Sequence, residues 1–140
     1  MRKGSLIASI SDLVSEKEAS IILSSLTEYA CLCGVDVHEL RFVGPIDGYF
    51  RWHPGEKPRI TLEVNLPIKN KAWVLAHEMG HLFTASEIVA DKPNVDLIFG
   101  EDKELIAKVE QAAEDWAFSF TIGRIRELRG LGRAPKCATA

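Results

Sequence analysis

Residues 73–83 read Trp-Val-Leu-Ala-His-Glu-Met-Gly-His-Leu-Phe and contain the pattern H-E-x-x-H. Residues four apart on an α-helix share one face, so His77 and His81 are expected to project side by side, close enough to bind one metal ion. Glu78 lies about 100° further round the helix, where it can reach a water molecule at that ion without joining the ligands. Two nitrogen ligands, a carboxylate base and an open position predict a zinc (Zn2+) hydrolase site.

The flanks of this motif are apolar, which predicts a buried helix over about residues 69–85. Buried polar side chains are costly unless they find partners, and a metal ion would be such a partner for His77 and His81. The alternative interpretation is that both histidines are ordinary hydrogen-bonded residues with no metal.

The composition is that of an ordinary globular protein, with 140 residues, 46% of them apolar and 26% charged. This length predicts a single domain over residues 1–140, with flexible ends at 1–14 and 133–140. The net charge of −3 argues against direct nucleic-acid binding through a basic surface.

Nothing in the sequence predicts a membrane protein or a secreted one. No apolar run approaches the ~18 residues of a membrane span, and the N-terminal segment is too short and mixed for a signal peptide. The three cysteines, Cys31, Cys33 and Cys137, form no disulfide framework. They suit reduced thiols, and we expect a cytoplasmic protein.

The rest of the chain predicts an α+β fold. Ser15 and Glu18 form a capping box that starts a helix over about residues 16–33. Short strand candidates follow at 40–43, 49–52 and 59–64, joined by turn residues, which predicts a small three-stranded antiparallel sheet. This sheet is expected to pack on a helical core formed by the motif helix and a C-terminal helix. Ser86 to Gly100 reads as a loop, and Asp102 as the N-cap of that last helix.

A catalytic zinc site usually has three protein ligands, so a third must come from outside the motif helix. The last helix offers five acids: Glu101, Glu104, Glu110, Glu114 and Asp115. Glu110 and Glu114 share a face in mid-helix, beside an apolar stripe. We interpret Glu110 as the third ligand and Glu114 as the acceptor of the free N–H of a ligand histidine. The alternative is that both are solvated acids on an exposed face.

The segments Val74–His81 and Val109–Ala117 together resemble the ImmA/IrrE family of small zinc metallopeptidases. In that family an L-A-H-E-[LIM]-G-H helix precedes a helix with an E-x-x-A-[ND]-x-[FW]-A pattern, and the resemblance covers roughly residues 40–122. Glu114 departs from it, since it stands where Asn or Asp is usual. Residues 120–123 lack the proline that often ends the second helix.

The resemblance implies a hydrolase in which His77, His81 and Glu110 hold zinc and Glu78 is the base. Family members are typically cytoplasmic proteins of bacteria, phages and other mobile elements, and several are implied to cleave a helix-turn-helix repressor. The resemblance thus predicts a metalloprotease whose partner is a protein substrate such as a transcriptional repressor. Two alternatives stay open: a non-catalytic zinc-stabilised module that sequesters a regulator, and a toxin–antitoxin component.

Overall fold

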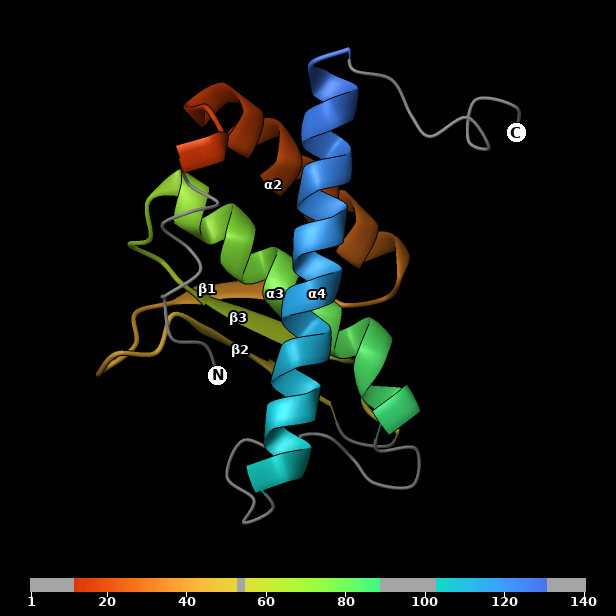
Figure 1. Ribbon diagram of the computed structural model, residues 1–140. Helices are drawn as coiled ribbons and strands as arrows, with labels where there is room; N and C mark the ends of the chain where they lie inside the picture. The colour runs from red at the N-terminus through yellow and green to blue at the C-terminus, as the bar shows by residue number, and fades with distance from the viewer. Residues whose placement is uncertain (1–11, 53–54, 89–102, 131–140) are drawn as a thin grey trace.

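The computed structural model of the protein describes residues 12–52, 55–88 and 103–130 (Figure 1). Three long helices and a three-stranded sheet make up these segments, which confirms the predicted α+β class. The expectations for Glu101, for the Asp102 N-cap, for Cys137 and for a flexible end at 133–140 lie outside the described residues. At the other end, Val14 is buried in the core.

Helix α2 (Glu16–Leu32) begins at the predicted capping box. The Glu18 amide donates to the Ser15 hydroxyl at 3.1 Å, and the Ser15 amide donates to the Glu18 carboxylate at 3.0 Å. Both bonds satisfy amides that the first turn of a helix leaves without partners. The buried residues of α2 recur at helical spacing, at Ala19, Ile22, Leu26 and Ala30.

The sheet consists of β1 (Asp36–Leu40), β2 (Gly48–Arg51) and β3 (Arg59–Glu63), in the order β1-β3-β2. Strand β2 is antiparallel to β3, but β1 is parallel to it, so the expectation of a fully antiparallel sheet was wrong. The turn residues after β1 do not close a hairpin between neighbours. They carry the chain across to the other edge, and β3 then inserts between the first two strands.

The first strand also lies earlier than the predicted range 40–43. Val37 of β1 packs against the core, and Val35, just before the strand, is buried. Val43, in contrast, is 99% exposed. Phe42 instead pairs with Tyr49, with ring centroids 5.9 Å apart. The apolar residues at positions 42 and 43 therefore lie in the loop between β1 and β2 and not in a strand.

Helix α3 (Ile68–Ile88) is the central element, and residues 72–81 are all buried. It contacts β2 and β3 on one side and packs against α2 and α4 (Lys103–Leu128), and α4 crosses it in Figure 1. The contact with the sheet is close, since a Cβ on Gly48 would lie 2.8 Å from Cγ1 of Val74. A helix that is buried on most sides explains why the H-E-x-x-H motif has apolar flanks in both directions.

The predicted motif helix, over about 69–85, is thus confirmed, but it continues to Ile88, into the segment expected to be a loop. The rest of that expected loop, residues 89–100, lies outside the described segments. Among the described residues, no helix combines the length and the apolar character that crossing a bilayer requires.

Candidate metal centre

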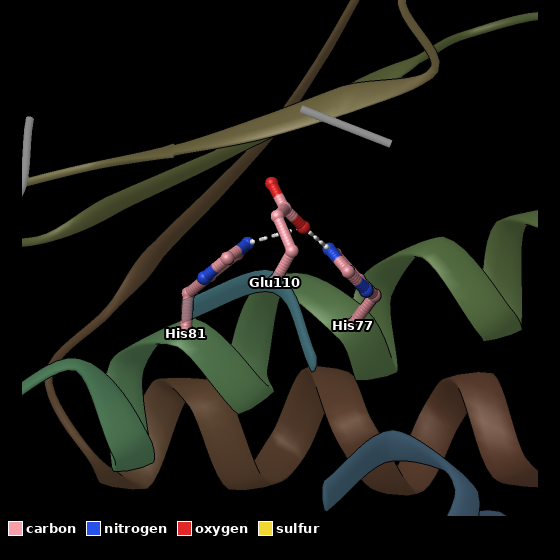
Figure 2. A group of neighbouring side chains, drawn as sticks. All are labelled: His77, His81 and Glu110. Carbon is pink, nitrogen blue, oxygen red and sulfur yellow. Dashed lines mark hydrogen bonds and ion pairs between the residues drawn. The ribbon is translucent and has the colours of Figure 1, made fainter. Parts of the chain in front are cut away.

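Three side chains that were singled out from the sequence meet between α3 and α4. His77 Nε2 lies 2.9 Å from Oε2 of Glu110, and His81 Nε2 lies 3.4 Å from the same oxygen. The two imidazole rings are nearly perpendicular, at 87°, with centroids 4.8 Å apart. Figure 2 shows one nitrogen of each imidazole turned towards the carboxylate of Glu110, which comes from α4.

The spacing of these atoms can be compared with what a metal ion needs. One potential ligand atom from each of the three residues lies within 4.8 Å of the others. A tetrahedral ion with bonds of about 2.0–2.2 Å keeps its ligand atoms roughly 3.3–3.6 Å apart. The observed 2.9 and 3.4 Å are close to that range. Two imidazoles and a carboxylate are also a common ligand set for zinc, so the residues fit a divalent ion.

The charges of the cluster also favour a cation. Burial lowers the pKa of His77, but the hydrogen bond to Glu110 and the close Glu114 carboxylate outweigh it and raise that pKa to about 9. Burial raises the pKa of Glu110, yet the hydrogen bond with His77 and the nearby imidazole of His81 hold that pKa well below its usual range. The pKa shifts thus favour a charged imidazole beside a charged carboxylate, and a bound divalent ion would take the place of that imidazole proton.

Glu114 lies one turn beyond Glu110 and contacts the other nitrogen of the same imidazole. Its Oε1 is 3.3 Å from Nδ1 of His77, whose Nε2 faces Glu110. A proton on Nδ1 donates towards Glu114 and leaves the Nε2 lone pair free for a ligand bond. This is the contact expected of a residue that fixes the histidine tautomer.

Glu78 is the most unusual polar residue of the centre. It is 0% exposed, and within the described ranges neither of its carboxylate oxygens has a hydrogen-bond partner. A buried carboxylate without a partner is costly, because it has lost its hydration and gained no replacement. Such a side chain is expected where a water molecule or a substrate group supplies the missing partner.

The apolar stripe of α4 explains how the acids reach the histidines. Val109, Ala113 and Ala117 are buried and face the core, and Glu110 and Glu114 are half-buried beside them. Asp115 is exposed and accepts a hydrogen bond from Gln111 at 2.9 Å, so it is not part of the cluster. Glu104, another of the five acids, is also exposed.

The polar side chains of the second strand face away from the motif helix. Along β2, Gly48 and Phe50 are buried, whereas Tyr49 and Arg51 are more exposed. Side chains alternate along a strand, so Tyr49 and Arg51 lie on the face opposite to Gly48, away from Val74 of α3. His53 lies outside the described segments, and His38 is exposed on β1.

One contact at this site was not predicted from the sequence. A row of stacked or tilted rings, Tyr29, Phe83, Trp116 and Phe120, connects the three helices with centroid distances of 5.1–5.4 Å. Phe83 follows His81 by two residues and Trp116 follows Glu114 by two. The row therefore packs α3 against α4 close to the metal cluster. The sequence hinted at this packing only through the aromatic residues of these helices.

Comparison with known proteins agrees with this geometry. Residues 33–124 match the Peptidase M78 family, described as the IrrE N-terminal-like domain, and the chain belongs to that family. This confirms the ImmA/IrrE resemblance found in the sequence. The comparisons with curated proteins and with solved structures gave no match.

Proposed function

We propose that the protein is a zinc-dependent endopeptidase of narrow specificity that cleaves an intracellular regulatory protein, such as the helix-turn-helix repressor of a phage or mobile element. The main support is that His77, His81 and Glu110 converge beside a buried Glu78 that has no hydrogen-bond partner in the described chain. Membership of a peptidase family adds the reaction class. The repressor as substrate rests on the family resemblance alone.

In this proposal, His77, His81 and Glu110 hold the ion, and Glu114 keeps the His77 proton on Nδ1. A bound divalent ion would supply Lewis-acid polarisation of a peptide carbonyl and would acidify a water molecule. Glu78 takes the proton that this water loses as it attacks the carbonyl carbon. The same carboxylic acid then gives the proton to the amine nitrogen as the C–N bond breaks.

The sheet offers a way to hold an extended peptide. Strand β2 is at an edge of the sheet and contacts α3, the helix that carries both histidines, whereas the opposite edge strand, β1, contacts α2. A substrate segment that adds to β2 would use main-chain hydrogen bonds for affinity and would lie beside the motif helix.

The experiment compares wild-type protein with Glu78→Gln in cells that contain the natural partners, by labelling and sequencing all new protein N-termini. We expect new termini in one or a few proteins with the wild type and a loss of 10²–10⁴-fold in their formation with the variant. Zinc content should be equal in the two proteins, since Glu78 is not a proposed ligand.

Two outcomes would contradict the proposal. In one, Glu78→Gln produces the same termini as the wild type. In the other, metal-loaded wild type produces none, yet the same intact regulator co-purifies with both proteins. The second outcome would favour the zinc-stabilised binding module instead.

A further inference from the structure

Helices α3 and α4 approach each other closely at a glycine. A Cβ placed on Gly80 would lie 2.5 Å from the carbonyl oxygen of Ala113, 2.9 Å from its Cα and 3.1 Å from its carbonyl carbon. The obstacle is the backbone of α4, which cannot rotate away as a flexible side chain would. No residue other than glycine fits at position 80 unless the helices separate.

This contact lies in the middle of the metal cluster on both helices. On α3, Gly80 comes three residues after His77 and directly before His81. On α4, Ala113 comes three residues after Glu110 and directly before Glu114. Gly80 is therefore flanked by the two histidines, and Ala113 is flanked at the same spacing by the two acids that contact these histidines.

We propose that Gly80 is a positioning residue: the absence of a side chain at this crossing sets how closely Glu110 approaches the two histidines and Glu114 approaches His77. The inference rests on the proposed metal site. It adds a role for a residue of the motif that neither binds the ion nor touches the substrate.

The size of the expected displacement can be compared with what a metal site tolerates. Ordinary contacts of a Cβ begin at 3.4 Å, so relief of the 2.5 Å contact needs about 0.9 Å of local separation. Metal–ligand distances hold to within about 0.2 Å of their preferred values. A shift several times that tolerance would take the Glu110 carboxylate out of bonding distance of an ion held by the histidines.

Glycine is also an unfavourable choice for its local structure. It lies in the interior of a 21-residue helix, where alanine has the higher helix propensity. The chain carries a second helical glycine, Gly123 of α4, whose Cβ would have no atom within 4 Å. The two glycines thus form a matched pair with the same change in propensity and opposite surroundings.

The test is to measure Zn2+ affinity, by competition with a chromophoric chelator, for the full-length wild type, Gly80→Ala and Gly123→Ala. We expect Gly80→Ala to weaken zinc binding at least tenfold and Gly123→Ala to stay within twofold of the wild type. The absorption spectrum of the Co2+-loaded proteins gives an independent readout. It should change in Gly80→Ala, because the carboxylate ligand is displaced, and should be unchanged in Gly123→Ala.

A general loss of stability is controlled by Leu26→Ala, which removes a buried side chain of α2 that is not at the crossing. This variant should be destabilised and yet bind zinc within twofold of the wild type. Should Gly80→Ala be unfolded in buffer, trimethylamine N-oxide is added to all four proteins to favour the compact state, and affinities are compared there.

Zinc affinity and a Co2+ spectrum equal to those of the wild type in folded Gly80→Ala would overturn the inference. The proposed peptidase would still stand, since its own test depends on Glu78. Conversely, a wild type that binds no zinc would remove the proposed function itself, and the two failures are therefore distinguishable.

Discussion

Helix α4 makes ion pairs with another helix at two places, and the two places differ in how completely their polar atoms are satisfied. Directly after its C-terminal residue, Arg129 pairs with Glu18 of α2 through two hydrogen bonds of 2.7 and 2.8 Å. Arg129 also donates to the Leu13 carbonyl at 2.6 Å. Glu18 in turn completes the capping box with Ser15. Both carboxylate oxygens of Glu18, and Nε and Nη2 of Arg129, therefore have protein partners.

The pairing of α4 with α3 is the opposite case. One oxygen of Glu110 is shared by two imidazoles at 2.9 and 3.4 Å. Beside it, the Glu78 carboxylate is buried, and both its oxygens lack a hydrogen-bond partner in the part of the chain that the structure describes. The carboxylate of the first contact is fully paired, and we call this Arg129–Glu18 contact the clamp. The second contact instead gathers buried polar groups that a ligand would complete.

The largest change in zinc affinity is expected when one histidine of the metal cluster is removed. His81→Ala should weaken zinc binding on the order of 10³-fold, beyond the 10–100-fold that loss of an outer partner typically costs. His38→Ala is the matched control, because this histidine is exposed on β1, and it should stay within twofold. Isothermal titration with zinc measures both variants. Equal losses in the two would mean that zinc binds to histidines nonspecifically.

Zinc should stabilise the folded protein through the cluster and not through the clamp. At a free zinc concentration of one hundred times Kd, the free energy of unfolding should rise by about 2.7 kcal/mol. Thermal melts with zinc and with a chelator give this increment. It should be retained in Glu18→Gln and lost in Glu110→Ala. An increment that survives in Glu110→Ala would place the stabilising ion elsewhere.

Removal of Glu114 should weaken zinc binding less than removal of a ligand does. Glu114→Ala is expected to weaken zinc binding 10–100-fold, because His77 loses the acceptor that fixes its tautomer. Glu114→Gln keeps an acceptor oxygen and should recover most of that loss. The neighbouring Asp115→Ala, at an exposed position, serves as the control in the same chelator competition. If it weakens binding as much as Glu114→Ala, the effect is one of overall charge.

The smallest effect, a loss of folding stability, is expected when the Arg129–Glu18 clamp is removed. Hydrogen bonds from Arg129 and from the Ser15 amide lower the pKa of Glu18 from 4.5 to about 2. Its carboxylate therefore stabilises the fold fully above pH 4.5, and this contribution is lost as the pH falls towards 2. Glu18→Gln should lower the free energy of unfolding by about 1 kcal/mol at pH 7, which is the upper end of the range for a partly exposed ion pair.

Urea unfolding of Glu18→Gln at pH 7 and at pH 3 measures this effect, with Glu28→Gln as an exposed control on the same helix. The difference from the wild type should shrink at the lower pH, and at pH 7 the zinc affinity of Glu18→Gln should equal that of the wild type. A difference that grows as the pH falls would have the wrong sign for a lowered carboxylate pKa.

Much of this arrangement was predictable because its causes are local in sequence. The start of α2 follows from Ser15 and Glu18, which are three residues apart. The approach of His77 to His81, and the shared face of Glu110 and Glu114, follow from a spacing of four on a helix. The role of these residues as ligands, base and orienting acid remains a prediction that the structure makes chemically consistent.

The parts that the sequence did not predict depend on where the chain goes between elements. Strands β1 and β2 are separated by turn residues, as a hairpin would be, yet β3 lies between them. The Arg129–Glu18 clamp joins residues 111 positions apart. The close approach at Gly80 depends on the crossing of two helices and has no signature beyond a small residue in each.

The most direct test of the central claim is the zinc content of the purified, dialysed protein, measured by mass spectrometry for the wild type and for Glu110→Ala side by side. If two histidines of α3 and one carboxylate of α4 hold a single ion, the wild type retains one zinc per chain and the variant retains almost none. A wild type without zinc, or a variant that keeps it as tightly, would contradict the account.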